Sequence, residues 1–309
     1  MVAFCDRLHF FISGKLKDEI FREVGCCRFG GHQTGSSPLL ALRNSRMPAQ
    51  GRCARTPKSW AEPEDAVHWT KSFMCGRAYS TYTDEELYLE YLNRKERRNP
   101  SVPFQVAPNY NLCPTQNAPV LRLVDGERQF DEMHWQLIPK WEKEFTVQFS
   151  TINARSESVF ESKLYGKLIT RQRCIVPLSG FFEWKKEGTK KRPFKIFRQD
   201  GSIMSVAGIW DTWHVGKPDA RHSFSILTTS ANDVMSGIHD RMPVILDQGS
   251  LDDWLDPEIH EPEPIMKLMK PCPNSWLATA EVSTLVNSPK NNTPAVLKTL
   301  EESKPTSLF

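Results

Sequence analysis

Polar and apolar residues alternate with short periods over residues 74–309, whereas residues 1–73 show no sustained period. An apolar residue at every second position, as at Phe194 and Ile196, is typical of a half-buried β-strand. The pattern predicts seven strands, at Pro119–Val124, Gln129–Trp135, Arg173–Leu178, Phe181–Lys185, Pro193–Arg198, Ile203–Ile209 and Ser223–Thr229.

Helical signals are fewer and shorter. Thr83 followed three residues later by Glu86 forms a capping box, and Leu87 and Tyr91 continue it at helical spacing. Further short helices are predicted at Glu157–Leu164, Ala231–Ile238, Ser250–Leu255 and Pro264–Met269. Because strands outnumber helices and lie close together, we expect one α+β domain over residues 74–309, with a mostly antiparallel, barrel-like sheet and short peripheral helices.

Residues 1–73 have a different composition. Their apolar run, Phe10–Ile12 with Leu8, is shorter than the roughly 7–15 residues of a signal-peptide core. Glycine, serine, proline and arginine then dominate residues 28–58. We expect this segment to be disordered or absent from the mature protein.

Bulk composition points to no particular ligand. The net charge is +3, with +4 on residues 1–73 and −1 on the remainder, so a nucleic-acid surface would have to be local. No window approaches about 18 uninterrupted apolar residues, which predicts no membrane span. The eight cysteines lack zinc-site spacing and the density of a disulfide scaffold, so we expect no metal and reduced thiols in an intracellular compartment.

Cys75 is the residue with the most distinctive chemistry. It follows Met74, and an initiator methionine before a small side chain is normally removed. Cys75 would then carry an α-amine, with a pKa of about 7.7–8.0, beside a thiol. Such an aminothiol condenses with an aldehyde to an imine and closes to a thiazolidine ring, which an internal cysteine cannot do. The plain alternative is an ordinary buried thiol.

Three other segments contain polar residues that a fold alone does not require. Asn153 and Arg155 fall where a loop is expected to enter a helix, as orienting and phosphate-binding groups or simply as a cap and a surface arginine. Glu183 lies between Phe182 and Trp184, and apolar surroundings raise the pKa of a carboxyl group toward the range of general acid–base catalysis. The alternative is an outward strand position.

His239 precedes Asp240, a neighbour that could fix the tautomer of a proton-shuttling imidazole. A hydrogen-bonded loop histidine is the alternative. Taken singly, none of these segments defines a function.

Taken in order, the segments closely resemble the SRAP family (SOS-response-associated peptidase, abasic-site processing). The motifs are Met-Cys-Gly-Arg at 74–77, Asn-Ala-Arg-Ser-Glu at 153–157, Pro-Leu-Ser-Gly-Phe-Phe-Glu-Trp at 177–184 and His-Asp-Arg-Met-Pro at 239–243. Supporting segments lie at 111–120, 134–141, 226–232 and 286–294. The resemblance covers essentially all of 74–309 and none of 1–73.

The resemblance implies a sensor of abasic sites in single-stranded DNA that forms a covalent thiazolidine through its N-terminal cysteine. It implies that Cys75 is the nucleophile, that Asn153 positions the amine and sugar, and that Glu183 relays protons. It further implies His239 as an acid in ring opening, Arg77 and Arg155 as phosphate ligands, and Trp135 as part of a wedge or stacking surface for bases. No cofactor is implied, and a monomer working beside the replication machinery is expected, in the nucleus of a eukaryote or the cytoplasm of a bacterium.

Two departures from the family pattern matter. Gln136 stands where the family usually has glycine after tryptophan. The 73 residues before Met74 would leave Cys75 with an amide instead of an amine, which forbids the thiazolidine. A thiol or self-processing peptidase, with lyase activity also open, and a non-covalent single-strand DNA-binding protein therefore stay as alternatives.

Overall fold

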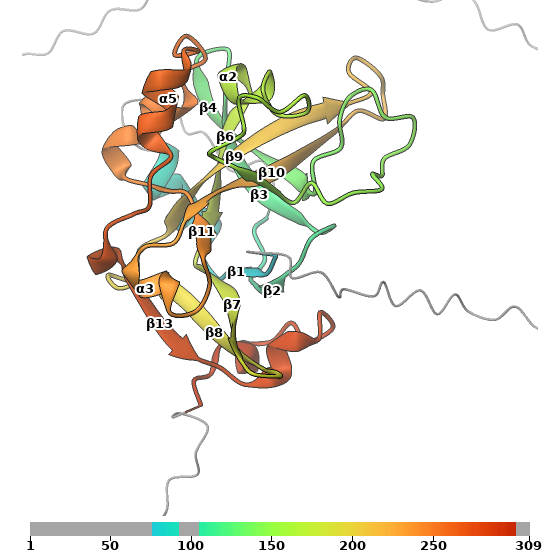
Figure 1. Ribbon diagram of the computed structural model, residues 1–309. Helices are drawn as coiled ribbons and strands as arrows, with labels where there is room; N and C mark the ends of the chain where they lie inside the picture. The colour runs from blue at the N-terminus through green and yellow to red at the C-terminus, as the bar shows by residue number, and fades with distance from the viewer. Residues whose placement is uncertain (1–75, 93–104, 301–309) are drawn as a thin grey trace, which may run out of the picture. The chain divides into compact units, whose positions relative to one another are not determined.

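The computed structural model describes residues 76–92 and 105–300, which fold into two β-sheets with short helices around them (Figure 1). The strands are β1 (Ala78–Ser80), β2 (Asn109–Leu112), β3 (Asn117–Val124), β4 (Glu127–Trp135), β5 (Asn153–Arg155), β6 (Arg173–Leu178), β7 (Gly180–Glu187), β8 (Lys190–Arg198), β9 (Met204–Trp213), β10 (Arg221–Ser230), β11 (Arg241–Pro243), β12 (Ile245–Leu246) and β13 (Leu277–Glu281).

The larger sheet closes on itself. Its strand order is β11-β10-β4-β3-β6-β9-β12, and β10 pairs with β9 as well as with β4. Strands β10, β4, β3, β6 and β9 therefore form a closed ring, in which only the β10–β4 pair is parallel. Closure leaves these strands with no free edge along the ring. The expectation of an α+β domain around a mostly antiparallel barrel is confirmed.

The smaller sheet is antiparallel, in the order β13-β8-β7-β1-β2. Its longest pairing is the β7–β8 hairpin, which turns through Gly188 and Thr189 between the paired residues Glu187 and Lys190. Gly188 has φ +60°, a conformation that glycine adopts without steric cost. The charged residues 185–192 therefore form a hairpin around this glycine.

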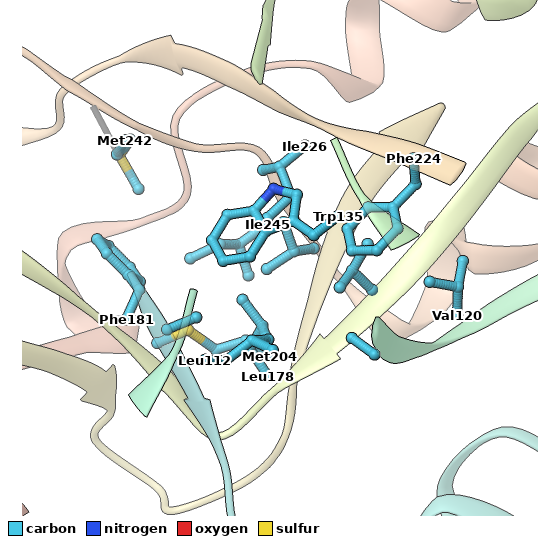
Figure 2. Packing of buried hydrophobic residues seen from close by; sticks show 14 of the residues in the cluster. Leu112, Val120, Trp135, Leu178, Phe181, Met204, Phe224, Ile226, Met242 and Ile245 are labelled. Atoms are coloured by element: carbon cyan, nitrogen blue, oxygen red, sulfur yellow. The ribbon is translucent and has the colours of Figure 1, made fainter. Parts of the chain in front are cut away.

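Two hydrophobic cores lie on opposite faces of the barrel strands, because side chains alternate along a strand. Val120 and Val176 belong to the core that also takes side chains from the smaller sheet, while Leu121 and Ile175 belong to the core covered by helices. Figure 2 shows the indole of Trp135 in the first of these cores. A third cluster, with Phe182 and Val286, packs the C-terminal segment onto the smaller sheet.

The helices are short and peripheral. They are α1 (Asp84–Leu87), α2 (Leu168–Arg171), α3 (Asp233–Ser236), α4 (Leu251–Leu255) and α5 (Pro262–Leu268), with a π-helical turn η1 (Tyr88–Leu92) and 3₁₀ turns η2 (Gln248–Ser250), η3 (Asn274–Trp276), η4 (Thr284–Asn287) and η5 (Pro294–Leu297). The capping box before α1 is confirmed: the Thr83 hydroxyl accepts from the Glu86 backbone N–H, and the Glu86 carboxylate accepts from that of Thr83.

Two local predictions were wrong. The helix expected at Glu157–Leu164 is a series of turns, because the Ser162 hydroxyl accepts from the backbone N–H groups of Leu164 and Tyr165 and so competes with helical pairing. Asn153 and Arg155 do not begin a helix either. They lie on β5, which pairs in parallel with β10.

Candidate active site

A pocket of about 580 Å³ opens where β1 begins and β7 continues past it. Gly76 and Arg77 line the pocket, and the Arg77 carbonyl accepts a hydrogen bond of 2.9 Å from the Phe182 backbone N–H. Glu183 is the next residue along β7. The pairing of β1 with β7 therefore brings Gly76 and Arg77, the described part of the first motif, to one site with the Phe-Phe-Glu-Trp motif. The remaining lining residues are Cys113, Pro114, Thr115, Gln116, Ile152, Trp184, Lys186, Lys191, Asn287 and Pro289.

Glu183 is buried, with 3% of its surface exposed, although it lines the pocket. It sits opposite Phe194 in the β7–β8 register, and Oε2 accepts from the Trp184 backbone N–H at 3.3 Å. A carboxyl group held by a sheet and shielded from bulk water keeps a fixed position from which to take or give a proton. Glu183 has the placement of a general acid–base group.

Arg77 is anchored at the same pocket. Its Nη1 donates to Asn111 Oδ1 at 2.8 Å and to the Val286 carbonyl at 2.5 Å, and the guanidinium lies 5.8 Å from the Trp184 ring. Burial lowers the pKa of Arg77. The Asn111 Nδ2 also donates to the carbonyls of Val286, Ser288 and Asn291. Arg77 therefore has a structural task, holding the C-terminal segment on the sheet, in addition to its place on the pocket wall.

Asn153 and Arg155 stand at alternate positions of β5. Asn153 is half-buried and follows Ile152, which lines the pocket, while Arg155 is exposed. Their neighbours in β10 are Ile226 and Thr228. The structure thus places Asn153 one residue from the pocket wall, and places the Arg155 side chain at the surface of the barrel.

His239 lies between α3 and β11 and is not among the residues that line the pocket. Its Nδ1 is 2.7 Å from Asp240 Oδ1 and 3.1 Å from the Arg241 backbone nitrogen. The first contact favours a proton on Nδ1, and the second needs Nδ1 as an acceptor. Since the two contacts need opposite roles of Nδ1, only one of them can be a hydrogen bond at a time.

An ion pair joins the two motifs that carry Asn153 and His239. The Arg241 guanidinium is buried, bonds both carboxylate oxygens of Glu157, and donates to the Thr228 carbonyl at 2.7 Å. This hydrogen bonding lowers the pKa of Glu157. Arg241 and Glu157 both belong to the sequence motifs given above, but their spacing along the chain did not show that they meet across β10.

Trp135 does not have the surface predicted for it. The side chain is 0% exposed, its Nε1–H donates to the Ile152 carbonyl at 3.1 Å, and it stacks on Phe224 (Figure 2). A fully buried indole cannot stack on a base without opening the core. The structure therefore contradicts a wedge or base-stacking role for Trp135, which is a core residue.

Cys75 lies outside the described residues. The described cysteines, Cys113, Cys174 and Cys272, are free and buried, and burial raises the pKa of each, to about 11 for Cys272. A raised pKa lowers the fraction of thiolate, the reactive form. Over the same residues, no cluster of three or more His, Cys, Asp or Glu could hold a metal ion.

The described chain has no helix that is both long and apolar enough to cross a membrane.

Sequence reasoning gave no role to Lys186 and Lys191, which line the pocket. Both belong to a charged hairpin whose lysines cannot be sorted from the sequence alone, because register decides which of them share a face. With Arg77 they make three cations against the single carboxylate of Glu183 in the lining.

A closed barrel, a smaller antiparallel sheet and a cation-rich pocket with a buried carboxylate together define the candidate active site. The chain belongs to the SOS response associated peptidase (SRAP) family, whose model matches residues 74–289. It is 32% identical over 226 residues to the abasic site processing protein YoqW of Bacillus subtilis, covering 73% of this chain and 99% of that protein. It is 31% identical over 265 residues to the abasic site processing protein HMCES of Gallus gallus, covering 74% and 78%.

Solved structures agree with this assignment. A crystal structure of a protein from Bacteroides thetaiotaomicron superposes with a TM-score of 0.60 at 26% sequence identity, covering 73% of this chain and 99% of that one. The family predicted from the ordered motifs is thus confirmed.

Proposed function

We propose that this protein processes abasic sites in single-stranded DNA by capturing the sugar aldehyde covalently on Cys75. The observation that carries the proposal is the cation-rich pocket with the buried Glu183, lined by Gly76, the residue that follows Cys75. An abasic site is a latent aldehyde on a polyanion, so this pocket offers matching groups. The names of the relatives, abasic site processing proteins, support the same substrate.

The chemistry needs a chain that begins at Cys75. The proposal requires the amine and thiol of an N-terminal Cys75 to reach the wall formed by Gly76, the next residue along the chain. The amine nitrogen adds to the aldehyde carbon, and loss of one water gives an imine. The thiol sulfur then adds to the imine carbon while its proton passes to the nitrogen, which closes the thiazolidine.

Glu183 is the proposed proton relay in these steps, because its carboxylate is fixed and lines the pocket. We propose Asn153 as the group that orients the amine and sugar, and Arg77 and Arg155 as phosphate ligands. His239 is the proposed acid in opening the sugar ring. Because His239 does not line the pocket, it would have to act from the far side of β10 or by contact with the bound DNA strand.

Residues 1–73 would then be absent from the active form, which agrees with a family match that begins at residue 74. A retained extension would leave a non-covalent DNA-binding protein. A thiol or self-processing peptidase that uses Cys75, Glu183 and His239 is the second candidate, supported by the name of the family model. We further propose that the protein acts as a monomer on single strands exposed at replication.

The test is a denaturing gel of protein mixed with an abasic single-stranded oligonucleotide. Protein that begins at Cys75 should give a shifted, heat-stable band. Protein with Met74 retained keeps the thiol but blocks the amine, so it should give none, as should Cys75→Ala. A band of equal strength from the Met74-retaining protein would refute capture by the aminothiol.

A further inference from the structure

The positive charges of the β7–β8 hairpin are divided between its two faces. Lys185 and Arg192 pair with Glu187, at 3.8 and 2.9 Å, and Arg192 also pairs with Glu281. These contacts place the carboxylates and their cations on one face. That face is close to neutral by itself.

The opposite face carries unneutralised charge. Lys186 and Lys191 are directly opposite each other in the β7–β8 register, and both line the pocket. Neither takes part in an ion pair formed by residues 76–92 or 105–300. Like charges directly opposite across two strands destabilise a sheet. Their cost is offset when an anion lies between them.

The location of this lysine pair relative to Glu183 says which anion fits. Lys186 follows Glu183 by three residues, which is about 10 Å along a strand and puts the two side chains on opposite faces of β7, yet both line the pocket. The half-buried Trp184 lies between them on the pocket wall, with its indole N–H bonded to Asn287 Oδ1 at 2.8 Å. An ammonium group at that distance meets a neighbouring part of the ligand when the reacting carbon is at Glu183. In a nucleic acid strand the neighbouring part is a phosphodiester.

We propose that Lys186 and Lys191 bind the phosphodiester backbone of the single strand beside the reacting nucleotide, so that the DNA leaves the pocket along the β7–β8 hairpin. This inference rests on the proposed function. Lysine contacts to phosphate carry no base information. The pair therefore gives affinity at any sequence, and selectivity for the lesion comes from the covalent step.

The experiment measures how salt weakens binding of the full chain to an intact single-stranded oligonucleotide, which has no aldehyde. Each phosphate neutralised on a single strand adds about 0.7 to the slope of log K against log salt concentration. The double variant Lys186→Gln/Lys191→Gln should lower that slope by about 1.4. The matched control, Lys185→Gln/Lys190→Gln, removes the same charge from the other face and should leave the slope within about 0.3 of the original.

Equal slopes for the two double variants, whether both fall or neither does, would overturn the proposal. All four lysines are at least partly exposed, so both variants should keep the melting temperature of the parent protein. Covalent capture is measured separately, with abasic DNA and protein that begins at Cys75. A normal covalent band together with an unchanged salt slope in Lys186→Gln/Lys191→Gln would reject the lysine site and keep the proposed function. A lowered salt slope without any covalent band would keep the lysine site and reject the proposed function.

Discussion

Gln136 occupies a backbone conformation that suits glycine, and replacing it should stabilise the protein. Its φ is 155°, while its backbone N–H bonds the carbonyls of His134 and Phe224 at 3.1 and 3.2 Å. A side chain in such a sparsely populated region costs about 1–3 kcal/mol. Glycine keeps both backbone hydrogen bonds and removes that strain. It also adds freedom to the unfolded chain, which costs about 0.4–1 kcal/mol.

The balance for Gln136→Gly is a gain of roughly 1 kcal/mol in the free energy of unfolding. For a domain of this size that corresponds to a rise of about 2–4 °C in Tm. Urea unfolding followed by fluorescence measures the free energy, and a thermal scan gives Tm.

The control is Gln129→Gly, at an exposed position within β4, where glycine should cost about 0.5–1 kcal/mol. Opposite signs for the two variants are expected. Loss of stability in Gln136→Gly, equal to that in Gln129→Gly, would refute strain at residue 136.

Three further outcomes are expected. Trp135→Ala should lose about 3–5 kcal/mol of stability by core truncation, while the protein that stays folded should keep its affinity for intact single-stranded DNA; a loss of about 1–3 kcal/mol in binding would restore a stacking role. Glu157→Gln should cost about 1 kcal/mol at neutral pH, a modest value because that carboxylate is half exposed. The pKa of Glu157 is lowered in the folded state, so its contribution to the free energy of unfolding is complete above the ordinary carboxyl pKa and is lost as pH falls. The free energies of unfolding of wild type and Glu157→Gln should therefore converge in acid; a difference between them that stays constant with pH would contradict this. Glu183→Gln should slow covalent capture by about 10²-fold or more without changing binding to intact DNA, as measured by single-turnover gels; an unchanged rate would remove Glu183 from the proton relay.

Periodicity was sufficient to predict much of the fold. All seven strands predicted from alternation are present, and Arg173–Leu178 has the predicted bounds. The other six strands, β1, β2, β5, β11, β12 and β13, were not predicted, because segments of two to five residues show little or no period and depend on their neighbours. The prediction of a helix at 157–164 was wrong for a related reason, since backbone N–H groups that donate to the Ser162 hydroxyl set a local structure that apolar spacing does not record.

The candidate site was predictable in its parts but not in its geometry. Glu183 was singled out by its aromatic neighbours, and it is buried at a pocket as that reasoning requires. The family resemblance implied a surface role for Trp135, and the sequence pattern could not correct it, because an aromatic residue at the end of an alternating strand looks alike whether it faces core or solvent. The Glu157–Arg241 pair depends on two strands meeting at β10, which no spacing along the chain reveals.

The central claim, capture of an aldehyde by the amine and thiol of Cys75, is tested most directly by intact mass. Protein isolated from its native cells is weighed before and after reaction with an abasic oligonucleotide. The account predicts a polypeptide that begins at Cys75 and a product one water lighter than the sum of protein and DNA, absent for Cys75→Ala. A polypeptide that retains residues 1–73 and still forms that product, or one that begins at Cys75 and forms none, would contradict it.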